Sequence, residues 1–157
     1  MRPPAPLVLA ALMAAAGGVA TRPTPLVAQD PVFAPALQVD LAAMKRSRGT
    51  WWRDITEGSG ALVREGSRVT IHFTGWLADG TRFESSRESG ETVTFAIGDG
   101  RVIRGWDDGL RGMRVGGVRQ LVIPPRSGYG GRGRPPVIPP DAMLVFEVEL
   151  VRIEGRN

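Results

Sequence analysis

The sequence predicts an α+β fold, in which a curved antiparallel β-sheet of about five strands wraps around one short α-helix. Between residues 50 and 153, several segments alternate apolar and polar side chains, the period of strands that bury one face and leave the other solvated. Only the stretch 98–113 carries apolar residues at helical spacing within a glycine-rich segment. Glycine and proline mark turns between these segments, so short strands that follow one another can pair.

The expected helix lies within residues 98–113, and its apolar face carries residues three or four positions apart: Ile103, Trp106, Leu110 and Met113. Glycines interrupt it, each costing about 1 kcal/mol relative to alanine, so packing must hold the helix close against the sheet. Trp106 is therefore either a plain core residue or the floor of a pocket. Asp107 and Asp108 are adjacent and do not face each other, which favours a solvated surface over a catalytic carboxylate pair.

The β segments are expected in chain order at 51–56, 69–74, 76–77, 82–84, 92–97, 118–123 and 142–153. A turn at Asp79-Gly80 would fold the third onto the fourth. Alternation places His72 away from the core, so it is expected to be a solvated strand residue rather than a base or a metal ligand. The loop 126–140 is too rich in proline and glycine for a helix or a central strand. Tyr129 lies within it and has no reason to be buried unless the loop covers something.

Residues 1–28 are typical of a secretory signal peptide, which predicts a periplasmic or secreted protein. Arg2 precedes an apolar run at 7–16, and small residues ending at Ala20 or Ala28 offer two cleavage sites. If the signal is cleaved, no stable membrane span is expected. An uncleaved membrane anchor stays open, although the apolar run is shorter than the roughly 18 residues that a span requires.

The rest of the chain divides into a flexible N-terminal tether at 29–49, which has no apolar period, and a folded domain at 50–157. The chain has no cysteine, which excludes disulfides, thiol catalysis and thiolate metal sites, and its single histidine gives little support to a zinc site. Basic residues are spread along the chain rather than clustered, so nucleic-acid binding is not expected. Phosphate-binding loops and nucleophile elbows are missing, and no metal or cofactor is expected.

Three motifs occur in order along the chain. The first is Ile-His-Phe-Thr-Gly-Trp-Leu-Ala-Asp-Gly-Thr-Arg-Phe-Glu-Ser-Ser at 71–86, and the second is Val-Ile-Arg-Gly-Trp-Asp-Asp-Gly-Leu at 102–110. The third combines Tyr-Gly at 129–130 with Ile-Pro-Pro at 138–140 and Leu-Val-Phe-Glu-Val-Glu-Leu at 144–150. Together they resemble the signatures of the FKBP-type peptidyl-prolyl cis-trans isomerases. The resemblance covers residues 50–154 and implies the same curved sheet on a short helix.

The resemblance also implies a proline-binding pocket with Trp106 as its floor and the following other lining residues: Phe73, Phe83, Val93, Val102, Ile103, Tyr129 and Phe146. Phe73 stands where the family often has tyrosine and Val93 where it often has phenylalanine, which bears on ligand affinity and sequence preference. Three residues are implied to act in the reaction. The backbone N–H of Ile103 and the hydroxyl of Tyr129 would donate hydrogen bonds, and Glu84, at a position that is often aspartate, would hydrogen-bond or steer the substrate.

The implied activity is rotation of X-Pro bonds in exported polypeptides, which assists their folding and requires no cofactor. The implied partners are proline-containing unfolded or exported polypeptides, and macrolides of the rapamycin type would compete for the pocket. Two alternatives stay open, because a non-catalytic polypeptide-binding chaperone or an interaction module could use the same pocket. The loop at 127–136 is too short for the extra domain, and 29–48 for the long N-terminal helix, that chaperone-active members of the family carry.

Overall fold

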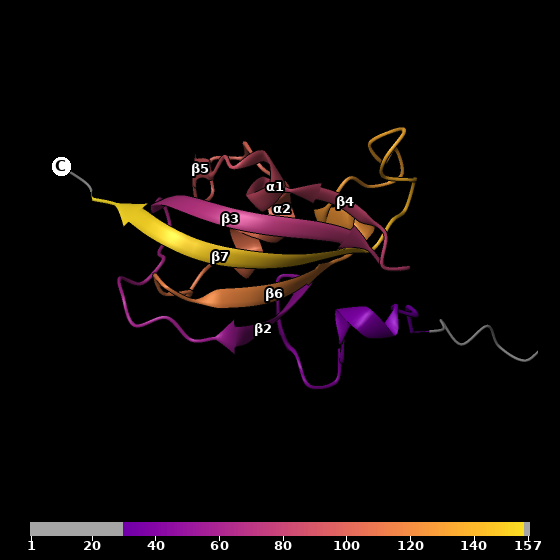
Figure 1. Cartoon of the computed structure of the whole chain (residues 1–157), viewed down its shortest axis with the longest axis horizontal. Helices are drawn as coiled ribbons and strands as arrows, with labels where there is room; N and C mark the ends of the chain where they lie inside the picture. Colours follow the sequence, from indigo (N-terminus) through magenta and orange to yellow (C-terminus); the bar gives the residue numbers. More distant parts are fainter. Residues whose placement is uncertain (1–29, 156–157) are drawn as a thin grey trace, which may run out of the picture. The chain divides into compact units, whose positions relative to one another are not determined.

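The computed structural model describes residues 30–155, so the expected signal peptide at 1–28 lies outside the described residues. A curved antiparallel sheet runs through the described part of the chain, with strand order β1-β2-β6-β7-β3-β4 and β5 paired to β3 (Figure 1). The strands are β1 (Lys45–Ser47), β2 (Thr50–Thr56), β3 (Arg68–Leu77), β4 (Arg82–Ser85), β5 (Val93–Ala96), β6 (Val118–Ile123) and β7 (Leu144–Glu154). The predicted α+β class is confirmed. Within residues 30–155 the sheet has seven strands where about five were expected, and β1, which pairs with β2, is the strand that the sequence did not indicate. The pairing of β4 with β3 agrees with the turn expected at Asp79-Gly80.

The helical elements are all short: η1 (Pro35–Leu37), α1 (Ser86–Ser89), α2 (Arg104–Gly109) and η2 (Pro125–Ser127). The helix expected within 98–113 is therefore only the six residues of α2, and turns occupy the remainder. Its glycines allow the close approach to the sheet that the sequence predicts. A Cβ atom at Gly105 would lie 2.5 Å from the Ile123 side chain, and one at Gly109 would lie 2.7 Å from the Leu121 side chain. No helix in residues 30–155 is long and apolar enough to cross a membrane.

The longest ladder of the sheet joins β3 to β7, from Leu77 opposite Leu144 to Arg68 opposite Glu154. Alternate side chains of this ladder point toward α2, since successive residues of a strand face opposite sides. The main core lies between the sheet and α2, and it includes Val69, Ile71, Phe73, Trp106, Leu110, Met113, Leu121, Ile123, Leu144, Phe146, Val148 and Leu150. The core thus fixes the position of Trp106 beneath the loops that precede and follow α2.

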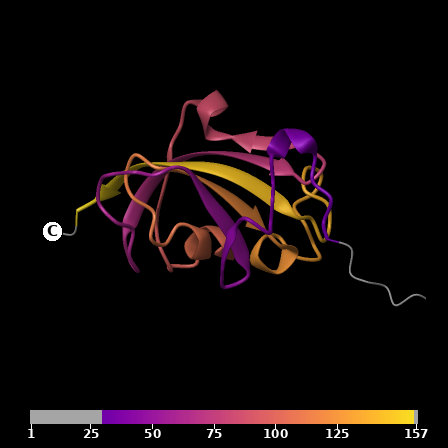
Figure 2. The ribbon, with the colours of Figure 1, turned by 90° about the horizontal axis from the view of Figure 1, so that it is seen from below.

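Residues 31–48 differ from the expected tether, because they pack on the other face of the sheet. Leu37 and Met44 are 9% and 8% exposed, and they contact Val122 of β6 and Val145 of β7. The Gln120 side chain donates a 2.7 Å hydrogen bond to the carbonyl oxygen of Leu37. Figure 2 shows η1, in indigo, on the side of the sheet opposite α2. A 3-10 helix of three residues and short turns make these contacts, and elements this short show no apolar period.

Two further expectations differ from the structure. Asp107 and Asp108 are 8% and 4% exposed rather than solvated. Asp107 Oδ1 accepts a 2.8 Å hydrogen bond from the backbone N–H of Gly98, and Asp108 Oδ2 accepts a 3.3 Å hydrogen bond from Arg104. Burial is the main cause that raises the pKa of Asp107 above its ordinary value.

His72 is half-buried rather than fully solvated. Its Nδ1 lies 3.0 Å from Ser86 Oγ, the hydroxyl that also accepts a 2.8 Å hydrogen bond from the backbone N–H of Phe73. Ser86 Oγ in turn donates to the carbonyl oxygen of Phe73 at 3.2 Å. His72 therefore contributes to the attachment of α1 to β3.

Candidate active site

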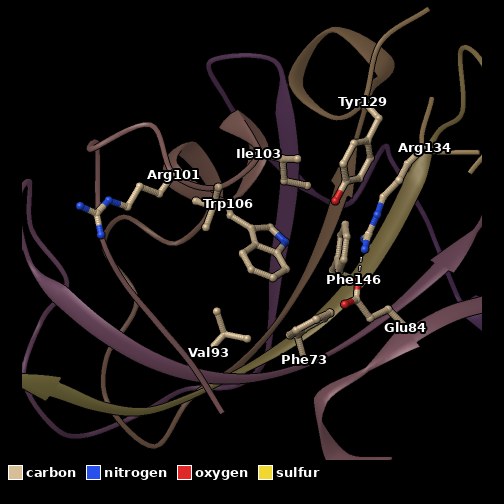
Figure 3. A pocket seen from close by; sticks show the side chains of 10 residues that line it. Phe73, Glu84, Val93, Arg101, Ile103, Trp106, Tyr129, Arg134 and Phe146 are labelled. Atoms are coloured by element: carbon tan, nitrogen blue, oxygen red, sulfur yellow. Dashed lines mark hydrogen bonds and ion pairs between the residues drawn. The ribbon is translucent and has the colours of Figure 1, made fainter. Parts of the chain in front are cut away.

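A cavity of about 430 Å³ opens between α2, the concave face of the sheet and the loop that follows η2 (Figure 3). Its lining residues are Phe73, Glu84, Val93, Arg101, Val102, Ile103, Trp106, Tyr129, Arg134 and Phe146. The structure therefore brings together all of the site residues named from the sequence except Phe83. The Phe83 ring packs edge-on against Phe146, one of the lining residues, at 5.6 Å between centroids.

Trp106 lies at the base of the cavity and is 7% exposed. Three rings hold its indole: Phe73 edge-on at 4.8 Å, Phe146 edge-on at 5.4 Å and Phe95 stacked at 5.7 Å between centroids. Edge-to-face and offset-stacked pairs add about 0.5–1.5 kcal/mol each beyond the burial of apolar area. The indole N–H is buried and has no hydrogen-bond partner among residues 30–155. The floor of the cavity is thus a rigid aromatic surface.

Ile103 precedes the first residue of α2 and has an extended conformation with φ of −58° and ψ of 142°. Its carbonyl oxygen accepts a 3.0 Å hydrogen bond from the backbone N–H of Trp106, so its position is tied to the floor. The first N–H groups of a helix lack partners within the helix. The Ile103 N–H likewise donates to no acceptor in the described part of the chain, and it is available at the edge of the cavity.

Tyr129 and Arg134 reach the cavity from the loop between η2 and β7. Ile138, which is 1% exposed, anchors this loop, and the backbones of Arg134 and Ile138 exchange hydrogen bonds of 2.8 and 2.9 Å. Gly133 lies beside the Ile138 carbonyl with φ of +62°, and a side chain there would collide with that carbonyl. The loop is therefore held by its own backbone contacts, although its sequence shows no regular pattern.

Arg134 joins the loop to the sheet across the mouth of the cavity. Its Nη1 donates a 3.2 Å hydrogen bond to Glu84 Oε2, and its guanidinium lies 6.0 Å from the centroid of the Tyr129 ring (Figure 3). Tyr129 first and Glu84 second raise the pKa of Arg134 above its ordinary value, so the guanidinium stays charged. Sequence reasoning missed Arg134, because its partner is 50 positions away.

Arg101 lines the opposite side of the cavity and was also missed from the sequence. Its side chain is 79% exposed and forms a 3.5 Å ion pair with Asp99. In Figure 3 it points away from the indole of Trp106. Its charge therefore lies at the rim rather than over the floor.

Comparison with known protein families shows which family has this arrangement of residues. The model of the FKBP-type peptidyl-prolyl cis-trans isomerases matches residues 60–151, which is more than half of the chain. The chain belongs to this family. The resemblance of the three motifs is thereby confirmed, and the protein is a peptidyl-prolyl cis-trans isomerase of the FKBP type.

Individual relatives agree with the assignment. An FK506-binding protein of Neisseria meningitidis serogroup A is 49% identical over 100 residues, which cover 64% of this chain and 92% of that protein. The human peptidyl-prolyl cis-trans isomerase FKBP2 is 54% identical over 94 residues, which cover 60% of this chain and 66% of that protein. The crystal structure of AtFKBP13 superposes with a TM-score of 0.65 at 36% identity, covering 71% of this chain and 98% of that one.

The cavity of this isomerase offers binding and hydrogen bonding rather than proton transfer. Its titratable lining residues are Glu84, Arg101, Tyr129 and Arg134. Glu84 is paired with Arg134, and His72 is not among the lining residues. A general base would have to lie within hydrogen-bond reach of a reacting proton. Rotation about an amide bond moves no proton and breaks no covalent bond, so the site needs none.

Proposed function

We propose that this isomerase rotates X-Pro bonds in exported polypeptides by holding the proline ring against Trp106. The observation that carries the proposal is the cavity, in which an aromatic floor and apolar walls meet two hydrogen-bond donors at the rim. They are the Tyr129 hydroxyl and the Ile103 N–H, which donates to no acceptor among residues 30–155. A proline ring is compact and apolar, so it suits such a floor better than a charged side chain does. The packing of Phe73 and Phe95 against Trp106 also supports a proline site, because it holds the indole floor in one position.

The reaction must overcome amide resonance, a barrier of about 18–20 kcal/mol. The planar amide is more polar than the twisted one, so a site that excludes water disfavours the planar ground state relative to the transition state. Phe73, Trp106 and Phe146 supply that water-poor surface, since each is 7% exposed or less. The Ile103 N–H would bind one substrate carbonyl group and hold the peptide while the prolyl bond turns.

Glu84 and Tyr129 would orient the chain on the other side of the proline. The Arg134 guanidinium fixes the Glu84 carboxylate at 3.2 Å, so this carboxylate is positioned to accept a hydrogen bond from a peptide N–H. Tyr129 would donate from the loop. Neither role requires a change of protonation during the reaction.

Export and macrolide binding complete the proposal. The signal-like pattern of residues 1–28 supports substrates outside the cytoplasm, and cleavage after Ala20 or Ala28 would release the mature protein. Intact-mass measurement on the protein from its native cells would detect either cleavage, whereas a mass that retains residues 1–20 would indicate an anchor.

A relative is named as an FK506-binding protein, and rapamycin-type macrolides would occupy the same cavity of this chain. Phe73 and Val93 would weaken that binding, because they offer a hydroxyl and a ring fewer than the family often has.

One comparison separates catalysis from chaperone binding. The catalysed isomerisation of a short X-Pro peptide and the suppression of aggregation of an unfolded protein without proline are measured side by side. Acceleration of the first with no effect on the second is the expected result. Suppression of aggregation without any acceleration of isomerisation would overturn the proposal in favour of a holding function.

A further inference from the structure

A second cavity, of about 330 Å³, lies beside the proline pocket. Its lining residues are Phe73, Glu84, Ser85, Ser86, Ser89, Glu91, Thr92 and Val93. Phe73, Glu84 and Val93 also line the proline pocket, so the two cavities share a wall and adjoin each other. A polypeptide whose proline lies on Trp106 therefore has a second hollow within reach of its neighbouring side chains.

The two cavities meet at Val93. This residue lies in β5 opposite Ile71 of β3, and it is only partly buried. In Figure 3 the short Val93 side chain lies next to Phe73 at the edge of the pocket. Because Val93 borders both cavities, a larger side chain at this position would take up room in the wall that they share.

The walls of the second cavity are polar and carry no basic side chain. Its three serines form hydrogen bonds within the protein. Ser86 Oγ bonds to the backbone of Phe73, and the hydroxyls of Ser85 and Thr74 lie 3.1 Å apart. Ser89 Oγ accepts a 3.3 Å hydrogen bond from the Glu91 N–H. Among the lining residues, only Glu84 and Glu91 carry a charged side chain.

The two carboxylates differ in their partners. Glu84 is neutralised by Arg134 at 3.2 Å. Glu91 forms no ion pair with any residue in 30–155, while the arginines on this side of the molecule, Arg82 and Arg87, are paired with Glu88 and Glu149. The second cavity thus carries one negative charge, on Glu91, that has no ion-pair partner among residues 30–155.

We propose that the second cavity is a substrate subsite for a lysine or arginine side chain next to the proline, with Glu91 as its anionic partner. The aliphatic stem of such a side chain would lie on Phe73 and Val93, and its charged end would reach Glu91. Long basic side chains commonly bury their stems on apolar surface while the charge stays near water. The inference rests on the proposed binding of the proline over Trp106, and it gives the isomerase a preference among X-Pro substrates.

The preference should be modest, because Glu91 is exposed and pairs between exposed charges are weak. We expect kcat/KM for a peptide with lysine beside the proline to exceed that for the glutamate peptide by about two- to five-fold. The ratio should fall as salt is added, since screening weakens exposed pairs.

The experiment uses peptides with lysine, leucine or glutamate at the residue before the proline, and a second set with the same residues after it. In the wild type, the lysine-to-glutamate ratio of kcat/KM is expected to rise above one in one of the two sets. Glu91→Gln should bring this ratio close to one. Glu88→Gln is the matched control, because it removes a neighbouring carboxylate that does not line the cavity, and the ratio should persist. Val93→Phe should reduce the ratio, because a larger side chain in the shared wall leaves less room for the stem of a basic side chain.

Three results would overturn the inference. Equal rates for lysine and glutamate peptides in both sets, with leucine peptides still turned over, would refute the subsite and leave the proposed function intact. A lysine preference that persists in Glu91→Gln would show that another group binds the cation. Failure of the protein to accelerate isomerisation of any peptide would refute the proposed function and the subsite with it.

Discussion

Replacing Leu37 with alanine is expected to lower the free energy of unfolding by about 2–3 kcal/mol, the lower part of the range for a buried leucine. Leu37 is 9% exposed and packs on Val122 and Val145, which are 0% exposed. The lower part of the range applies because Leu37 also borders a surface cavity of about 220 Å³. Water from this cavity can fill part of the space that the removed methyl groups leave. The Gln120 bond to the Leu37 carbonyl oxygen survives the change, because it involves only backbone of Leu37.

Urea unfolding followed by tryptophan fluorescence measures this loss, as a lower midpoint at an unchanged slope. Val32→Ala is the matched control, because Val32 lies in the same segment and is 85% exposed, and its effect should stay within about 0.5 kcal/mol. The kcat/KM of Leu37→Ala should equal that of the wild type while the protein is folded, since Leu37 lies across the sheet from α2. Unfolding of Leu37→Ala at the wild-type midpoint would contradict this reasoning and restore the tether hypothesis for residues 31–48.

Three further outcomes are expected. Because burial raises the pKa of Asp107, its protonated form favours folding below the ordinary pKa of 3.8, and this stability is lost as the pH rises through the raised pKa. Urea unfolding at a series of pH values should therefore show a smaller fall in stability above about pH 4 for Asp107→Asn than for the wild type. If the dependence of stability on pH is the same in both proteins, ionisation of Asp107 does not cause the fall. A double-mutant cycle of Arg134→Ala and Glu84→Gln should give a coupling of about 0.2–1 kcal/mol that declines with salt, because the two side chains are 55% and 44% exposed. The kcat/KM should be flat between about pH 6 and 8, and an inflection abolished by His72→Gln would refute catalysis without proton transfer.

The strands could be read from the sequence because they bury one face, and burial of one face imposes a period of two. Val69, Ile71 and Phe73 are all buried as that period predicts. The outer face was harder to read. Val122 and Val145 lie directly opposite each other on it, and two paired apolar residues on a face expected to be wet are a signal that something covers them. The covering residues are Leu37, at the end of the three-residue 3-10 helix η1, and Met44, next to a turn, and elements this short have no period that would identify them.

The candidate site likewise contains residues that the sequence could identify and residues that it could not. The aromatic residues around Trp106 could be named because they lie within the three motifs, and the structure places them around one cavity. Arg134 could not be named, since its role depends on how the loop brings it to Glu84. The burial of Asp107 was also missed, because the helix is shorter than its apolar spacing suggests and the turn at Gly98 closes over it.

The kcat/KM of Trp106→Leu for an X-Pro peptide tests the central claim most directly. Leucine keeps apolar volume at the floor but removes the flat ring, and loss of a stacked contact of about 0.5–1.5 kcal/mol corresponds to a fall of about two- to twelve-fold. Trp76→Leu is the matched control, because Trp76 packs with the cluster on the other face of the sheet and should leave kcat/KM unchanged. A folded Trp106→Leu protein with reduced kcat/KM, beside a Trp76→Leu protein with wild-type kcat/KM, is the expected result. A folded Trp106→Leu protein with wild-type kcat/KM would contradict the assignment of this cavity as the proline site.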